Sequence, residues 1–177
     1  MTRPPRAGGT EVRLTPLTAD DEATARQAHA ELADDYFTFL LDWRPDLPWP
    51  AYLRLLRDRR YGIDVPAGQV PGTFLAARVG ADLVGRVSIR HDLNDFLAAV
   101  GGHVGYAVRP AFRGRGYATQ VLRQALVLAR AEGVGDVLVT CQDGNAASAA
   151  TIVRCGGVLE DVRTADDGRR HRRYWIS

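Results

Sequence analysis

Two glycines one residue apart, Gly114 and Gly116, stand between an apolar run at 103–108 and an amphipathic run at 117–132. The first run predicts a strand and the second a long helix. The first N–H groups of a helix have no intrahelical acceptor, and the macrodipole adds positive charge there. Glycine lets this backbone come close to a bulky ligand, and two neighbouring arginines add full charges. We therefore expect a binding site for a phosphorylated ligand.

Two nucleotide-binding motifs fit this loop less well. A P-loop requires a lysine, whereas all 23 basic residues of this chain are arginine. A dinucleotide fingerprint is matched in part, with Thr119 in place of its last glycine and Asp143 as a potential ribose ligand beyond the next strand. That fingerprint usually opens a domain, but about a hundred residues precede it here.

A third pattern fits the loop and its surroundings. Arg113-x-x-Gly116-x-Ala118 matches (Q/R)-x-x-G-x-(G/A), and in this context it resembles the GNAT family, the Gcn5-related N-acetyltransferases. The likeness covers residues 72–177 well, because a strand, an Asn-x-x-Ser, a short helix and a Gly-Gly pair follow in the family's order. The segments that resemble an uncharacterised "predicted acetyltransferase" branch are Arg90–Asn94, Gly102–Tyr106 and Arg173–Ile176.

The resemblance implies an α/β (α+β) fold with a mixed, mostly antiparallel sheet of six to seven strands. Helices would cover both faces, and a central pair of strands would be splayed. It implies an acyltransferase that moves acetyl from acetyl-CoA to a primary amine by direct nucleophilic attack, without a metal. The acceptor would be a small-molecule or peptide amine, and a homodimer is possible. The alternative is a non-catalytic module that binds acyl-CoA.

The resemblance also implies which residues bind the coenzyme. Its diphosphate would lie on the loop and its pantetheine arm against the strand before the loop. Asn145 would hold the arm by its side chain, although a helix N-cap is an equally good interpretation of this residue. The full set is Tyr106, Ala107, Val108, Arg113, Gly114, Arg115, Gly116, Tyr117, Ala118, Thr119, Asn145 and Ser148.

Catalytic candidates follow from the chemistry of amine acetylation. A general base removes the proton of the amine, and His103 lies close to where the family often places one; a structural hydrogen bond is the alternative. Many family members carry a tyrosine as acid where this chain has Ile152, so that role falls to Cys155, Tyr106 or Tyr174. A buried, unreactive thiol is the alternative interpretation of the cysteine.

Two further regions invite functional interpretations. Family members bind the acceptor near segments that correspond here to 34–49 and 164–169. In the first, acids lie among aromatic residues and would suit a cationic amine. The arginine cluster at 169–173 is consistent with nucleic-acid binding, but its alternation with aromatic residues favours a terminal strand.

The elements that position these residues can be read from periodicity. A capping box at Thr18 and Asp21 predicts a helix that runs to about residue 35. Three prolines at 45–50 interrupt the chain before a second helix, and Asp166–Gly168 predicts a hairpin turn. The predicted elements are strands at 11–14, 73–79, 83–90, 103–108, 137–141, 158–164 and 170–176, and helices at 18–35, 51–60 and 117–132, with a short one after 145.

Composition narrows the class of protein. The 177 residues suffice for one domain over 11–177, with a disordered tail over 1–10. A net charge of +2 does not favour nucleic acid, and no apolar run reaches the ~18 residues that a membrane span needs. The first ten residues lack the apolar core of a secretory signal, and two distant cysteines favour a reducing compartment, hence the cytoplasm. The absence of lysine suggests a GC-rich genome and so a bacterium.

Overall fold

The computed structural model describes residues 11–177, so the predicted tail over 1–10 lies outside the described residues. Within this part of the chain, seven strands form one sheet in the order β1-β2-β3-β4-β5-β7-β6. Neighbouring strands run antiparallel except β4 and β5, which confirms the predicted mixed sheet. The strands are β1 (Arg13–Thr15), β2 (Gly72–Val79), β3 (Asp82–Arg90), β4 (Val104–Val108), β5 (Val137–Gln142), β6 (Val158–Thr164) and β7 (Arg170–Ile176).

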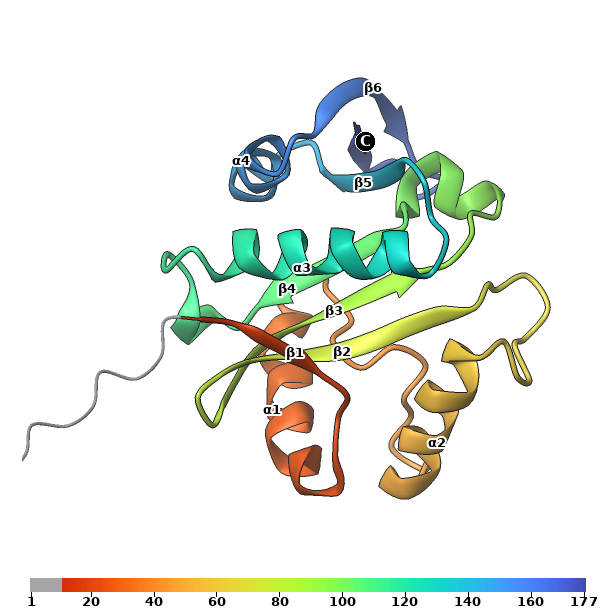
Figure 1. Ribbon diagram of the computed structural model, residues 1–177, viewed down its shortest axis with the longest axis vertical. Helices are drawn as coiled ribbons and strands as arrows, with labels where there is room; N and C mark the ends of the chain where they lie inside the picture. The colour runs from red at the N-terminus through yellow and green to blue at the C-terminus, as the bar shows by residue number, and fades with distance from the viewer. Residues whose placement is uncertain (1–10) are drawn as a thin grey trace, which may run out of the picture.

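Helices cover both faces of the sheet, as predicted. Figure 1 shows α3 along one face of β1 to β4, with α1 and α2 against the opposite face. Each face buries its own apolar cluster: α3 and α4 pack on one, and α1 and α2 on the other. The helices are α1 (Glu22–Ala33), α2 (Trp49–Arg60), α3 (Tyr117–Ala131) and α4 (Ala146–Arg154). No helix within residues 11–177 has the length and apolarity to cross a membrane.

The long helix α3 buries the stripe that its sequence predicts. Val121 and Ala125 are fully buried, and each large aliphatic side chain of such a stripe contributes about 1.5–3 kcal/mol. Polar side chains secure its edge, because Val12 N–H donates to Gln120 Oε1 at 2.9 Å and Gln124 Nε2 donates to Val12 O at 2.7 Å. The helix is therefore held both to the sheet and to the segment that enters β1.

Several predicted boundaries were wrong by a few residues. Strand β1 begins at Arg13 and not at residue 11. Helix α1 ends at Ala33, since Tyr36 adopts a left-handed φ of 55° that no helix can continue through. Helix α2 begins at Trp49 and takes Pro50 into its first turn, where the missing N–H of proline costs nothing. Proline at that position starts the helix rather than breaking the chain.

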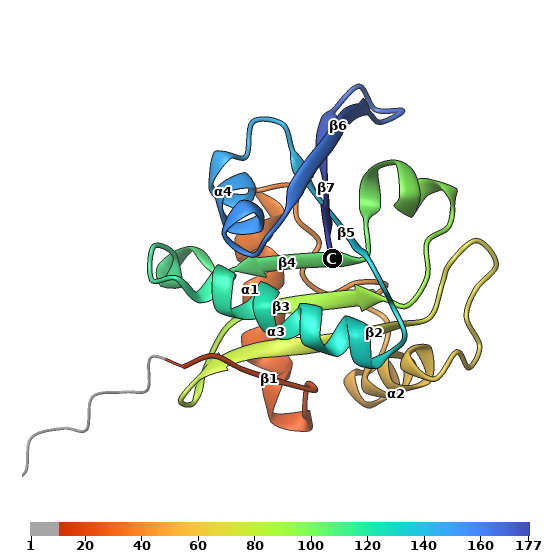
Figure 2. The same ribbon diagram turned by 45° about the horizontal axis from the view of Figure 1, so that its top comes forward.

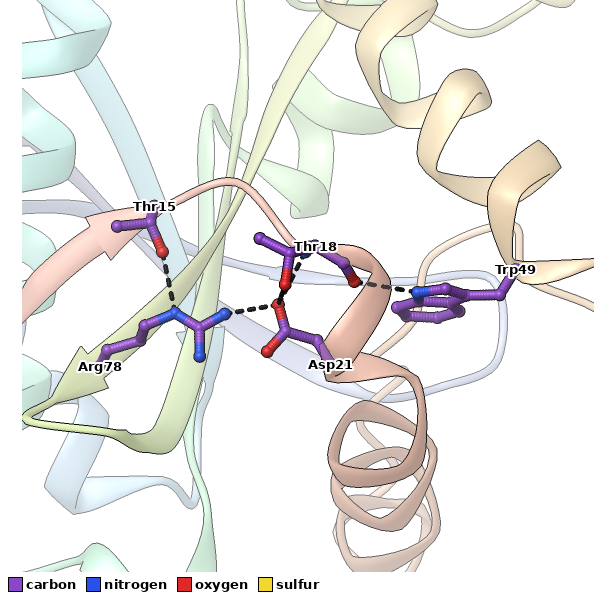
Figure 3. Close-up of polar contacts among 5 residues, drawn as sticks. All are labelled: Thr15, Thr18, Asp21, Trp49 and Arg78. Carbon is purple, nitrogen blue, oxygen red and sulfur yellow. Dashed lines mark hydrogen bonds and ion pairs between the residues drawn. The ribbon is translucent and has the colours of Figure 1, made fainter.

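A polar cluster joins β1, α1, α2 and the end of β2 (Figure 3). Asp21 accepts hydrogen bonds from Thr18 N–H at 2.7 Å and pairs with Arg78 Nη2 at 2.5 Å. Arg78 Nε also donates to Thr15 Oγ1 at 2.9 Å, and Trp49 Nε1 donates to Thr18 O at 3.0 Å. The predicted capping box is thus present, and its acid also neutralises a half-buried arginine of the sheet.

The parallel strands β4 and β5 diverge. They pair at one position, Val104 opposite Val139, next to a hydrogen bond from His103 N–H to Leu138 O at 2.7 Å. Beyond this point, β5, β7 and β6 run steeply across the direction of β4 (Figure 2). The predicted splay of the central pair is confirmed, and it opens toward the C-terminal end of β4.

Candidate functional site

The loop between β4 and α3 presents backbone donors at the open end of the splay. Gly114 and Gly116 have φ of 75° and 77°, values that a side chain disfavours, and a Cβ on either would meet open space. The first hydrogen bond of α3 runs from Gln120 N–H to Gly116 O at 3.3 Å. The N–H groups just before Gln120 therefore lack intrahelical acceptors, and the first turn of α3 contains no acid. This end of the helix suits an anion.

The two arginines of the loop have different surroundings. Arg113 Nε donates to Val108 O at 3.0 Å, and its Nη2 pairs with Asp35 at 2.5 Å. Its side chain thus ties the loop to the end of β4 and to the turn after α1. Arg115 is exposed, donates to Ala111 O at 3.2 Å, and forms no ion pair with any residue of 11–177. Of the two, Arg115 has the charge that is available to a ligand.

The edge of β4 in the splay carries backbone groups that face away from β3. Arg90 N–H donates to His103 O and Arg109 N–H donates to Val84 O, so the odd-numbered residues bond toward β3. Because strand backbones alternate, the amide groups of Tyr106 and Val108 point to the β5 side, where β5 has moved away. The N–H groups of these residues can bind an extended ligand with amide groups of its own.

A phenol links β4 to α4 across this region. The Tyr106 hydroxyl lies 3.0 Å from Ser148 Oγ, and burial raises the pKa of Tyr106 to about 12. Asn145 Oδ1 accepts a hydrogen bond from Ser148 N–H at 3.0 Å, which is the geometry of an N-cap. The structure therefore brings Tyr106, Asn145 and Ser148 together, with the oxygen of Asn145 already used by the helix.

The remaining acid candidates lie near the same helix. Ile152 is fully buried and has no proton to donate. Cys155 Sγ lies 3.8 Å from Thr119 O, and burial raises the pKa of the thiol, as it does for the neighbouring Cys141. Both thiols hence keep their protons at neutral pH. Tyr174 is buried in the core on β7.

His103 is placed as a structural residue would be. The residue is 7% exposed, and Leu138 N–H donates to Nδ1 at 2.9 Å. A neutral imidazole that accepts at Nδ1 carries its proton on Nε2, so neither nitrogen offers a spare lone pair. Burial lowers the pKa of His103, with a smaller lowering by Arg90 and an opposing effect of Asp92. The role of base stays a prediction, and this geometry favours the structural alternative.

Most acids of the predicted acceptor region are already paired with arginines, whereas Asp34 is exposed and makes no ion pair with residues 11–177. Asp35 pairs with Arg113, Asp42 with Arg59 at 3.1 Å, and Asp46 with Arg44 at 3.4 Å. The arginine cluster at 169–173 is likewise paired: four of its arginines contact carboxylates of Asp143, Glu160, Asp161 or Asp167, and residues 170–176 form the predicted strand. Strand β7 lies between β5 and β6, so these charges pair within the sheet and do not protect a sheet edge as the sequence had suggested.

Three polar residues of β3 were not predicted from the sequence as possible site residues. Arg86, Ser88 and Arg90 alternate along β3, which is otherwise apolar beyond its first residue Asp82, and they share the face covered by α1 and α2. Two charged residues at alternate positions of a central strand were the available signal, because such positions are normally apolar. Within residues 11–177 no group of three His, Cys, Asp or Glu side chains could hold a metal ion.

Comparisons with known proteins agree with this arrangement. The sequence profile of the acetyltransferase (GNAT) family matches residues 27–156. None of the curated proteins compared with the chain matches it. The structure of the microcin C7 self-immunity acetyltransferase MccE, in complex with acetyl-CoA and AMP, has a TM-score of 0.65 at 17% identity, over 95% of this chain and 93% of that one.

Two further solved structures share the fold at similar identity. RimJ of Mycobacterium smegmatis, in complex with CoA-disulfide, has a TM-score of 0.66 at 19% identity, over 94% of this chain and 82% of that one. RimL, a ribosomal L7/L12 alpha-N-protein acetyltransferase in complex with coenzyme A, has a TM-score of 0.64 at 17% identity, over 95% and 94%.

Proposed function

The chain belongs to the acetyltransferase (GNAT) family, and we propose that it transfers acetyl from acetyl-CoA to a primary amine by direct nucleophilic attack. One observation carries this proposal: the unbonded N–H groups at the start of α3 follow the end of β4 just where β4 has left β5. An anion site and an open strand edge are thus adjacent. A coenzyme with a diphosphate and an amide-containing arm needs both.

The residues present fit acetyl-CoA, which supplies the acetyl group as an activated thioester. The N–H groups from Gly114 to Thr119 would hold its diphosphate, with Arg115 adding charge. The backbone of Tyr106 and Val108 would pair with its arm. Ala107, which the sequence also suggested, bonds toward β3 and would only flank the arm. MccE, RimJ and RimL were crystallised with acetyl-CoA or coenzyme A, which supports the same ligand here.

Tyr106 is proposed as the group that donates a hydrogen bond to the leaving sulfur. A pKa of about 12 keeps the phenol protonated at neutral pH. Full transfer of that proton to a thiolate of pKa ~8.5 would be uphill by several kcal/mol, so a hydrogen bond without transfer is the favoured role. The backbone N–H of Val108 would donate to the carbonyl oxygen, where a fixed donor stabilises developing charge.

The acceptor is a small-molecule, peptide or protein amine, and the cytoplasm, where acetyl-CoA is available, is the proposed location. RimL is a protein acetyltransferase, which supports including protein amines. The direct test is to incubate the chain with acetyl-CoA and a panel of amines and to follow free thiol. Thiol that appears only with an amine is the expected result.

A pair of glycine variants separates the loop from general effects on α3. Gly116 and Gly133 flank α3, both have left-handed φ, and neither would place a Cβ against another atom. Gly116→Ala and Gly133→Ala therefore carry similar backbone strain. We expect only Gly116→Ala to weaken coenzyme binding, by about tenfold or more. Equal effects of the two variants would contradict the loop assignment.

A non-catalytic acyl-CoA-binding module is the second candidate, and buried Ile152 at the family's usual tyrosine position favours it. Coenzyme binding without release of thiol for any amine would support this candidate over the enzyme.

A further inference from the structure

Buried arginines in this chain normally have carboxylate partners. Among residues 11–177, three arginines are less than a tenth exposed, namely Arg86 (2%), Arg109 (8%) and Arg173 (4%). Arg109 forms a two-point pair with Glu31 at 2.8 and 2.9 Å, and Arg173 contacts Glu160 and Asp161. Arg86 forms no ion pair with any residue of this range. It is the exception that requires an explanation.

The contacts of Arg86 are all to neutral groups. Its Nη1 donates to Ser88 Oγ at 2.8 Å and to Gly105 O at 3.0 Å, and its Nη2 donates to Thr38 O at 2.7 Å. The guanidinium lies 4.3 Å from the ring centre of Phe37, and its Nε has no partner among the described residues. Burial lowers the pKa of Arg86 to about 9, so the group is still charged at neutral pH.

A second arginine on the same face of β3 also lacks a carboxylate. The side chain of Arg90 makes no hydrogen bond or ion pair with residues 11–177, and burial lowers its pKa. It lies against β4, because a Cβ built on Gly105 would come within 2.9 Å of its Nη1. The missing side chain at Gly105 is thus what admits the guanidinium.

Arg90 lines a cavity between α2 and strands β2 and β3. The cavity has a volume of about 70 Å³, and Ser88 and Phe74 contribute to its floor. Asp42 and Arg59 on its wall neutralise each other at 3.1 Å. The charge of Arg90 is therefore not neutralised by another residue of the cavity lining. The space equals that of about two water molecules, enough for one carboxylate or phosphate group.

Arg90 lines the cavity, and Arg86 contacts Ser88 in its lining. Two such uncompensated cations are costly for a fold, because a buried charge is stabilised only by a partner that replaces its hydration. The chain supplies such partners to Arg109 and Arg173 but not here. We propose that this cavity binds an oxyanion of the acceptor, so that the substrate is a primary amine that also bears a carboxylate or phosphate group. This inference rests on the proposed function and specifies its substrate.

The position of the cavity relative to the splay fits such a substrate. Arg90 covers Gly105, and the next residue of β4 is Tyr106, whose amide groups face the splay. The guanidinium of Arg90 lies beside Gly105 of β4, and neighbouring strands are ~4.8 Å apart, so a short molecule can place its oxyanion at Arg90 and its amine at the edge of β4. Planar guanidinium binds both carboxylate and phosphate, so the two sources are separated by experiment.

The test measures binding to the full chain without acetyl-CoA, by calorimetry or by chemical-shift titration. The probes are three small primary amines, namely β-alanine, O-phosphoethanolamine and propylamine. Wild type is compared with Arg90→Gln, with Arg90→Lys and with the control Arg54→Gln, which removes an exposed arginine of α2. We expect wild type and the control to bind an anionic amine at least about tenfold more tightly than propylamine.

Arg90→Gln should abolish that preference and Arg90→Lys should retain part of it. Whichever of β-alanine and O-phosphoethanolamine binds better identifies the oxyanion. If Arg90→Gln does not fold, Gly105→Ala decides in its place, since its Cβ displaces the guanidinium. Equal affinity for all three amines in wild type, or a preference that survives Arg90→Gln, overturns the inference. Failure of thiol release with an intact anion preference would reject the proposed function instead.

Discussion

The two ends of the β2–β3 hairpin carry half-buried arginines in opposite electrostatic settings. Near the turn, Arg78 has Asp21 at 2.5 Å and Thr15 at 2.9 Å, so its charge and donors are satisfied within the chain (Figure 3). At the end of the hairpin away from the turn, Arg90 has no carboxylate partner within residues 11–177 and lines a cavity. A cation that the chain neutralises holds elements together, whereas one without a partner is available to a ligand. The following predictions test that contrast.

The largest effect on stability is expected at the Asp21–Arg78 pair, near the turn of the β2–β3 hairpin. Asp21→Ala leaves Arg78 without its counter-charge in a place where both side chains are largely buried. We expect the free energy of unfolding to fall by about 3 kcal/mol, measured by urea denaturation. Asp20→Ala, which removes the exposed acid beside it, should change the value by less than ~0.5 kcal/mol. Similar losses in the two variants would contradict the structural role of the pair.

The same pair predicts a dependence on pH. Burial acts to raise the pKa of Asp21, but hydrogen bonds from Arg78 and Thr18 outweigh it, so the pKa is lowered in the fold. Its contribution is then present above the unfolded pKa of ~3.9 and is lost as the pH falls through the lower folded value. The stability gap between wild type and Asp21→Asn should accordingly be wide at neutral pH and narrow in acid.

His103 tests whether a polar residue close to Arg90 is structural or catalytic. His103→Ala leaves Leu138 N–H without its acceptor, which should cost about 1–3 kcal/mol of stability, and His103→Asn should recover part of it. A folded variant whose kcat/KM keeps the wild-type value and pH profile would exclude the base. Loss of an ionisation below ~6.5 would restore the catalytic prediction.

The lowered pKa of His103 should also make the free energy of unfolding depend on pH. Because burial lowers this pKa, the unfolded chain binds more protons than the fold near pH ~6, and stability rises with pH there. Wild type should therefore lose stability as the pH falls below ~6.5, by more than His103→Asn does. The difference between the two proteins isolates this residue from the other histidines.

Tyr106, on β4 beside the splay, tests whether a residue at the proposed coenzyme site affects catalysis. Tyr106→Phe keeps the ring but removes the hydroxyl, and kcat should fall by about tenfold, or ~1.4 kcal/mol, with little change in the affinity for coenzyme. Ser148→Ala removes the partner but leaves the phenol, so it should affect kcat less. Equal losses of kcat in the two variants would indicate that the Tyr106–Ser148 contact, and not the phenol as a donor to the sulfur, supports catalysis.

The smallest effect on stability is expected at Arg90 itself. Arg90→Met removes a cation that has no internal partner, so stability should stay within ~1 kcal/mol of wild type or rise. Arg78→Met, the matched change near the turn of the hairpin, should destabilise the fold because it leaves Asp21 unpaired. Thermal melts of both variants compare the two ends directly. A large loss at Arg90 would show that its charge supports the fold.

Much of the fold could be predicted because its signals are local. The alternation at 170–176 and the stripe of α3 specify their elements without distant contacts. Boundaries near 33–50 were missed because a left-handed Tyr36 and a proline in the first turn of α2 are settled by packing. Within the site, the glycine loop was visible in the sequence, whereas the engagement of Arg113 by Asp35, 78 residues away, was not.

The sequence by itself determined the glycine loop, the helix that follows it, the strands and hence the family, since each depends on residues a few positions apart. Only the tertiary structure decided which arginines have carboxylates beside them. Arg78 meets Asp21 across 57 residues and Arg109 meets Glu31 across 78, while Arg86 and Arg90 meet none in the described chain. Electrostatic compensation depends on distance in space, and folding sets that distance.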